Sequence, residues 1–108
     1  MTDWLKRAED GLDRLLETDR QLAELRTKWE RDKRKAKRKW SAIYLRTDGK
    51  NIEERKAQAE THEDYQRAEA AEMTSLLEYE AMKNERDTAK LVIEFWKSWQ
   101  RAVREGEI

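Results

Sequence analysis

The 108-residue sequence contains no cysteine and no proline, only three glycines and one histidine, and no long apolar run. The absence of cysteine excludes disulfides and thiolate chemistry, and is compatible with a reducing cytosol. No stretch is apolar enough for a membrane span or a secretory signal. Because proline and glycine are the residues that interrupt helices, their scarcity favours long helices. We therefore expect a protein built of long helices.

Charged residues are the most abundant class in the sequence. Asp, Glu, Lys and Arg make up 44% of the chain, and hydrophobic residues make up 37%. The abundant Ala, Glu, Lys, Arg and Leu are strong helix formers, and nothing indicates a strand. We expect one all-α domain with a narrow core. The formal net charge is zero, which by itself argues against a polyanion-binding protein. The two signs are, however, unevenly placed along the chain.

Local signals predict three helices. Their predicted ranges are 3–46, 52–60 and 62–105, with Thr2 capping the first helix and Gly106 ending the third. At 1.5 Å per residue, each long helix would be about 66 Å in length. The predicted fold is a coiled-coil-like hairpin, in which two long antiparallel helices are joined by a turn and a short helix.

The stretch "RTDGKN" predicts the turn. It supplies Asp48 and Gly49, and glycine most easily adopts the left-handed conformation that closes a helix. Asn51 with Glu54 forms a capping-box pattern that opens the short helix. Thr61, followed by acidic residues, predicts a new helix start.

One face of the first predicted helix follows a heptad pattern. Its apolar members are Leu5, Ala8, Leu12, Leu15, Leu22, Trp29, Ala36, Trp40 and Ile43. Asp19, Arg26 and Lys33 fall on the same series, and we expect their side chains to reach outward. The third helix carries a broader face, formed by Tyr65, Ala68, Ala71, Ser75, Tyr79, Met82, Ala89, Val92, Trp96, Trp99 and Val103.

Folding the chain back at the turn predicts which residues face each other. The expected neighbours are Trp40 with Ala68 and Ala71, Trp29 with Tyr79, and Ala8 and Leu12 with Trp96 and Trp99. Two helices bury only one stripe each, so much aromatic surface is expected to stay exposed far from the turn. That surface comprises Trp4, Phe95, Trp96 and Trp99. We expect a homodimer or a larger oligomer to cover it.

The stretch "RTKWERDKRKAKRKW", residues 26–40, contains nine Lys or Arg and two acidic residues, a net charge of +7. Residues 68–82, which should face it, contain four Glu and no basic residue, a net charge of −4. We favour interhelical ion pairs and solvated faces as the role of this charge. The alternative is contact with nucleic-acid phosphates, for which the candidate residues are Lys28, Arg31, Lys35 and Lys39.

No constellation of residues indicates catalysis. Trp29 and Trp40 lie at seam positions, so we favour packing over base stacking as their role. His62 has no cysteine or second histidine with which to share a metal, and is interpreted as a surface residue. No glycine-rich loop, nucleophile motif or metal-ligand spacing accompanies the carboxylates. We expect no enzymatic activity, no metal and no cofactor.

The stretch "WSAIYLRTDGKNIEERKAQAE", residues 40–60, resembles a pattern in small, largely uncharacterised helical-hairpin proteins of tailed phages and prophages, especially those of actinobacterial hosts. The shared features are an aromatic and aliphatic helix end, a glycine turn and a Glu-Arg-x-Ala element, here Ile43, Tyr44, Leu45, Gly49, Glu54, Arg55 and Ala57. The resemblance implies an accessory protein in an infected bacterial cytoplasm, in a group of which some members are encoded near recombination or replication genes. From the residues themselves, we expect Arg55 to cap carbonyls at the end of the first helix.

Three functional hypotheses follow. The first is a noncatalytic phage or prophage accessory protein that self-associates and binds a protein partner through a helical face. The second is a nucleic-acid-binding accessory of phage recombination or replication that uses residues 26–40. The third is an inhibitor of a host or antiviral protein, acting through the acidic face between Glu53 and Glu80.

Overall fold

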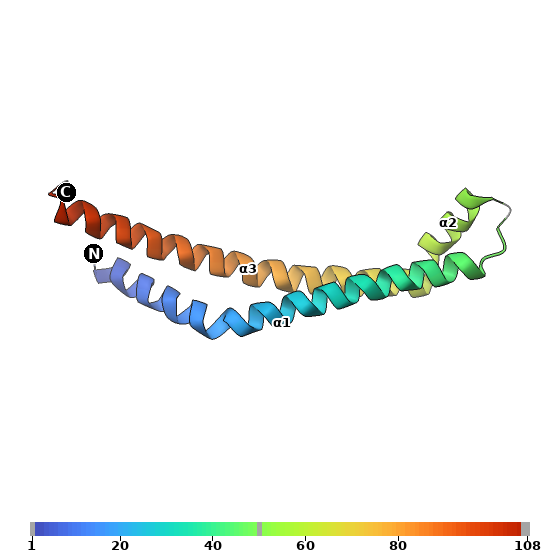
Figure 1. Ribbon diagram of the computed structural model, residues 1–108, viewed down its shortest axis with the longest axis horizontal. Coiled ribbons are helices and arrows are strands. Elements are labelled where there is room, and N and C mark those ends of the chain that lie inside the picture. Colours follow the sequence, from blue (N-terminus) through green and yellow to red (C-terminus); the bar gives the residue numbers. More distant parts are fainter. Residues whose placement is uncertain (1, 50, 107–108) are drawn as a thin grey trace. The chain divides into compact units, whose positions relative to one another are not determined.

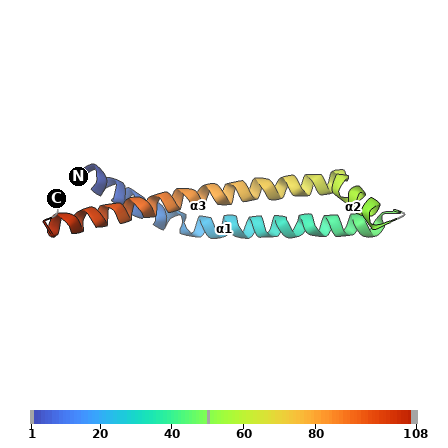
Figure 2. The ribbon, with the colours of Figure 1, turned by 90° about the horizontal axis from the view of Figure 1, so that it is seen from above.

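The computed structural model describes residues 2–49 and 51–106, apart from the side chain of Thr2. This part of the chain forms three helices and no strand: α1 (Thr2–Arg46), α2 (Ile52–Thr61) and α3 (Glu63–Arg104). The long helices α1 and α3 pack against each other, as Figure 1 and, from above, Figure 2 show. The predicted all-α hairpin is therefore confirmed.

The helix ends lie close to the expected ones. Helix α1 already includes Thr2, and the side chain that was predicted to cap it is not among the described parts of the structure. The Asn51 side chain accepts a hydrogen bond of 2.8 Å from the Glu54 backbone N–H, as the capping-box pattern predicted. The break between α2 and α3 falls at His62, one residue later than the predicted start at Thr61. Gly106 follows α3 with φ of 74°, the left-handed conformation expected of a terminating glycine.

Gly49 does not adopt the predicted left-handed conformation, since Gly106 is the positive-φ glycine in the described residues. The first helix is instead closed by Thr47, whose hydroxyl donates a 2.7 Å hydrogen bond to the Ile43 carbonyl. Glycine is required at position 49 for a different reason. A Cβ there would lie 2.3 Å from Cγ of Arg55, so only glycine allows this side chain to approach the turn.

Contacts divide the chain into two compact units. The turn unit consists of residues 24–79, and the terminal unit of residues 1–23 together with 80–108. In the turn unit, the buried residues are Ala36, Ile43, Ala59 and Ser75. In the terminal unit they are Ala8, Gly11, Thr18, Met82 and Arg86. Small and polar residues form much of both cores, which agrees with the narrow core expected from the composition.

The terminal unit does not have the predicted register. Gly11 faces Ala89, and a Cβ at position 11 would lie only 3.3 Å from the Ala89 carbonyl oxygen. Leu12 is therefore turned out of the seam and is 53% exposed, so its predicted packing against Trp96 and Trp99 is wrong. The backbones approach most closely where the side chains are smallest, and this contact outweighs burial of the leucine.

A buried arginine occupies the seam of the terminal unit. Arg86 is 8% exposed and donates hydrogen bonds to the Leu15 carbonyl at 2.7 Å and to the Thr18 hydroxyl at 2.8 Å. Its second terminal nitrogen lies 3.3 Å from an Asp19 carboxylate oxygen. The heptad pattern could not predict that Arg86 is buried, because the pattern expects apolar residues in the seam and Arg86 is charged.

Candidate nucleic-acid interface

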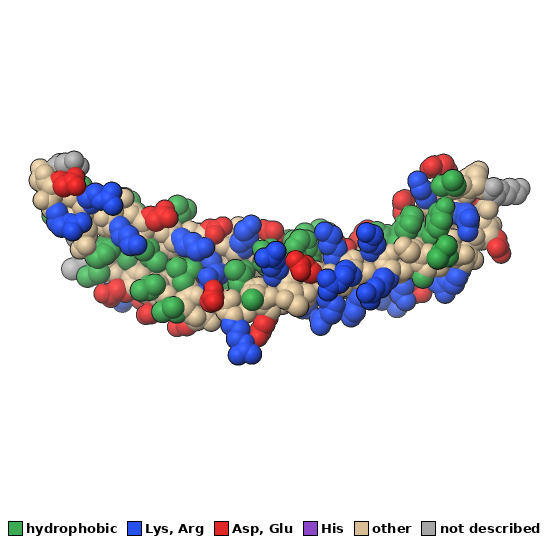
Figure 3. Space-filling model, in the orientation of Figure 1, with side chains coloured by type: hydrophobic (Ala, Val, Ile, Leu, Met, Phe, Trp, Pro, Cys, Tyr) green, Lys and Arg blue, Asp and Glu red, His purple; other side chains and the backbone are tan. Residues whose placement is uncertain are grey.

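The basic stretch lies on α1 within the turn unit, and Figure 3 shows Lys and Arg side chains gathered over this part of the helix. Three of its cations have partners. Arg26 pairs with Glu30 at 3.3 Å, and Lys28 pairs with Glu78 of α3 at 3.2 Å. The ammonium of Lys33 lies 5.4 Å from the centre of the Trp29 ring, a cation–π contact.

The other six cations of the stretch have no ion-pair partner among the described residues. We call them the basic strip: Arg31, Arg34, Lys35, Lys37, Arg38 and Lys39. All six are exposed. The expected pairing with the acidic residues of the third helix is therefore limited to Lys28 and Glu78.

Two carboxylates near the stretch form hydrogen bonds with uncharged side chains instead of pairing with its cations. Glu69 accepts a 2.8 Å hydrogen bond from the Tyr65 hydroxyl, on its own helix. Asp32, which belongs to the stretch itself, accepts a hydrogen bond from the buried Ser75 hydroxyl. These two carboxylates stabilise the seam and its flank. Glu72 and Asp64 line hollows that also contain Lys37 and Lys39, but form no ion pair with them in the described residues.

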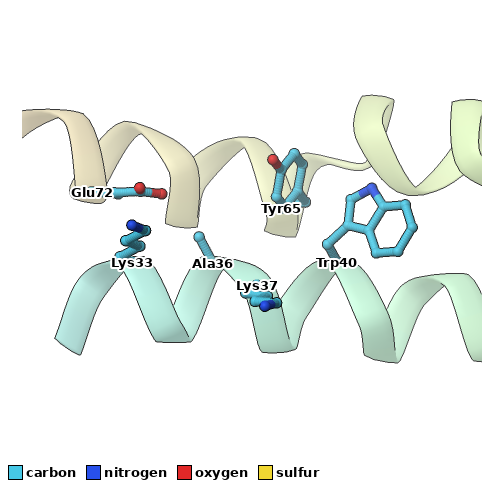
Figure 4. Close-up of a pocket in the computed structure, with 6 residues that line it drawn as sticks. All are labelled: Lys33, Ala36, Lys37, Trp40, Tyr65 and Glu72. Carbon is cyan, nitrogen blue, oxygen red and sulfur yellow. The ribbon is translucent and has the colours of Figure 1, made fainter. Parts of the chain in front are cut away.

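An open hollow adjoins the basic strip on one side of the seam (Figure 4). It is lined by Lys33, Ala36, Lys37, Trp40, Tyr65 and Glu72. Trp40 from α1 and Tyr65 from α3 lie next to each other along it, while Lys33 and Glu72 point toward one another from the two helices. Trp40 is half-buried.

The ring of Trp40 is held by a second aromatic residue of its own helix. Its centre lies 5.3 Å from that of Tyr44, and the two planes are 10° apart. Tyr44 is in turn covered by the Arg55 guanidinium, 4.9 Å from the ring centre. Stacking of this kind fixes the orientation of an indole that is not fully enclosed.

The hydrogen bond between Tyr65 and Glu69 changes the acidity of the phenol at the hollow. The neutral phenol donates a hydrogen bond to Glu69, and burial and the surrounding carboxylates also oppose a phenolate, so the pKa of Tyr65 is raised to about 12. Tyr65 is therefore a neutral donor throughout the physiological range.

Two further hollows lie along the seam where alanines of α3 meet cations of the strip. The first is lined by Lys35, Arg38, Lys39, Ala42 and Ala68. The second is lined by Lys39, Asp64, Arg67, Ala68 and Ala71. The charged residues that line the first hollow are all basic, so phosphates could bind at its edge, whereas the second also contains the carboxylate of Asp64.

Arg55 performs the capping role predicted for it. Its guanidinium donates a 3.4 Å hydrogen bond to the Tyr44 carbonyl, near the end of α1. This contact depends on the close approach permitted by Gly49. Asp48 is exposed beside that glycine, and Glu54 contributes its backbone N–H to the α2 cap. The turn residues thus fix the end of the hairpin.

His62 has a local role that the sequence interpretation missed. Its Nδ1 accepts a 3.1 Å hydrogen bond from the Asp64 backbone N–H, so the imidazole caps the start of α3. No spacing signal identified this role, because the usual capping residues are Ser, Thr, Asp and Asn.

The remaining aromatic candidates divide between the two units. In the turn unit, Trp29 stacks on Tyr79 with ring centres 5.6 Å apart, as the hairpin pairing predicted. In the terminal unit, Trp4 lies 4.4 Å from Phe95, which is 46% exposed. Trp96 and Trp99 are half-buried. Trp29 is therefore a packing residue rather than a base-stacking platform.

Within residues 2–49 and 51–106, no group of three or more His, Cys, Asp or Glu side chains is placed to hold a metal ion. Among the helices described here, none combines the length and apolar character that crossing a bilayer requires. Comparison with protein-family models, with curated proteins and with solved structures finds no match to this chain.

Proposed function

We propose that this protein is a noncatalytic accessory protein that binds nucleic acid through the basic strip. The observation that carries the proposal is the set of six exposed cations without a carboxylate partner among the described residues. The phosphates of a nucleic acid would neutralise this cluster, which no carboxylate of the described residues does through an ion pair.

The arrangement of the strip supports contact with a nucleic-acid backbone. Lys35, Arg38 and Lys39 of α1 line one apolar hollow together with Ala42 and with Ala68 of α3. Arginine and lysine in such a row neutralise phosphates without reading base sequence. Binding should therefore be largely independent of sequence and strongly weakened by salt.

The resemblance of residues 40–60 to small phage and prophage proteins provides a setting for this activity. Under it, the protein would act in recombination or replication of phage DNA in a bacterial cytoplasm. No catalytic group is needed for such a role, since binding alone protects or presents the nucleic acid.

Charge reversal tests the proposal. In a fluorescence-anisotropy titration at roughly 50 mM salt, Lys35→Glu/Lys39→Glu should weaken nucleic-acid binding by about tenfold or more. The matched control, Lys90→Glu/Lys97→Glu, makes the same change at exposed lysines of the terminal unit and should have little effect. Equal losses in both variants, or no binding by the unaltered protein, would contradict the proposal.

Self-association is a second candidate function, favoured by exposed leucines in the terminal unit. Leu5, Leu12 and Leu16 of α1 are 40%, 53% and 72% exposed, and their spacing of seven and four places them along one stripe. The chain exposes 8317 Å², whereas a folded monomer of 13.1 kDa typically exposes about 6,400 Å². The difference, roughly 1,900 Å², is more than twice the area of about 800 Å² that each partner buries in a standard protein interface.

Light scattering or sedimentation at micromolar concentration tests self-association. Leu16→Glu should dissociate the oligomer, because it places a charge within the proposed contact. Leu45→Glu is the matched control, since Leu45 is 75% exposed but belongs to the turn unit. A wild-type protein that stays monomeric removes this candidate and leaves the stripe available to a different protein partner.

A further inference from the structure

We infer that the hollow beside Trp40 binds an unpaired base, so that the preferred ligand of the basic strip is single-stranded nucleic acid. This inference rests on the proposed function and specifies its ligand. It is carried by an aromatic hollow that adjoins the unpaired cations.

The hollow has the components of a stacking site. The indole of Trp40 is half-buried, is stacked on Tyr44 at 5.3 Å, and lies next to Tyr65 along the hollow. A ring held in this way loses little conformational entropy when a base stacks on it. The small side chain of Ala36, which is 3% exposed, forms part of the lining and leaves the space open.

Cations are placed to hold the strand that carries the base. Lys33 and Lys37 lie one helical turn apart on α1, and both line the hollow that contains Trp40. Glu72 faces Lys33 across the hollow, which directs the phosphate toward Lys37 and the rest of the basic strip. One strand can therefore contact lysines along α1 while a base enters between the helices.

A duplex does not satisfy this geometry. Its bases are stacked on one another and paired, so their faces cannot reach a ring recessed between α1 and α3. Duplex DNA would still contact the exposed lysines and arginines of the strip through its phosphates. The structure thus predicts that both forms bind, and that only the single strand uses Trp40.

The decisive variant is Trp40→Leu, which keeps apolar bulk and removes the stacking surface. Affinity for an unpaired thymidine oligonucleotide of about 15 nucleotides should fall by about 5- to 100-fold. Affinity for a duplex of the same length should stay the same. Trp40→Phe should restore much of the single-strand binding, and Trp99→Leu, in the terminal unit, is the control. Circular dichroism checks that each variant is folded.

A measurement on the unaltered protein covers the case in which Trp40→Leu does not fold. An oligonucleotide containing 5-iodouracil is irradiated in the complex, and the cross-linked peptide is identified by mass spectrometry. The inference predicts cross-links at Trp40 or Tyr65. Cross-links confined to the terminal unit would overturn it. A uridine oligonucleotide should bind as the thymidine one does, because stacking does not read the 2′-hydroxyl.

The outcomes separate this inference from the proposed function. If the unaltered protein binds neither single strands nor duplexes at low salt, both are wrong. If Lys35→Glu/Lys39→Glu abolishes binding but folded Trp40→Leu binds single strands as the wild type does, only the stacking site is wrong. Preference for the duplex over the single strand would also overturn the inference.

Discussion

Arg86 donates a hydrogen bond of 2.8 Å to the Thr18 hydroxyl, and both side chains are buried in the terminal unit. The hydroxyl in turn donates at 2.6 Å to the Arg14 carbonyl, so Thr18 links the buried arginine to the backbone of α1. A buried charge requires such partners, so Thr18 helps to hold Arg86 in the seam.

Thr18→Val should lower the free energy of unfolding by about 1–3 kcal/mol, because it leaves a buried guanidinium N–H without one of its acceptors. The matched control is Thr88→Val. Thr88 also bonds a carbonyl of its own helix, that of Asn84 at 3.0 Å, but it is exposed. That variant should change stability by less than about 0.5 kcal/mol. Urea unfolding followed by circular dichroism measures both, and equal losses would contradict a special role for Thr18.

The register of the terminal unit makes a second prediction. Gly11→Leu should destabilise the protein by about 1–3 kcal/mol or more, because the added side chain meets the Ala89 backbone. Leu12→Ala should cost less than about 1 kcal/mol in the monomer, because Leu12 is 53% exposed. Thermal unfolding of dilute protein compares the two variants. If Leu12→Ala lowered the stability more than Gly11→Leu, the result would contradict this register and support the one that the heptad pattern predicted.

The phenol of Tyr65 provides a test of the geometry at the hollow. With its pKa raised to about 12, it should ionise well above the ordinary value of 10. The hydrogen bond to Glu69 is formed by the neutral phenol. Its contribution to stability is therefore present below pH 10 and is lost as the pH rises toward 12. Ultraviolet titration should show one of the three tyrosines ionising late, and Tyr65→Phe should remove that step.

Much of the fold could be predicted because its signals are local. The absence of proline, the Asn51 cap and the terminal Gly106 each act within a few residues, so the sequence indicates them directly. The stacking of Trp29 on Tyr79 also agreed with prediction, since both are close enough to the turn for its geometry to fix their pairing. Errors in register accumulate only farther along the helices.

The remaining features depend on tertiary contacts. The seam position of Arg86 contradicts any apolar pattern, and the contact between Gly11 and Ala89 depends on how closely two backbones approach. The cluster of basic residues could be identified from the sequence. Whether acidic residues form ion pairs with them could not be predicted from it. That outcome depends on hydrogen bonds such as the one from Ser75 to Asp32, which no spacing rule indicates.

The salt dependence of nucleic-acid binding tests the central claim most directly. The logarithm of the affinity should fall linearly with the logarithm of salt concentration, with a slope of about −0.7 per phosphate contact for a single strand. Lys35→Glu/Lys39→Glu should make this slope shallower by at least about one unit, because it removes two contacts of the basic strip, while Lys90→Glu/Lys97→Glu should leave it unchanged. A slope that is the same in all three proteins, or no binding at low salt, would contradict the assignment of the basic strip as a nucleic-acid interface.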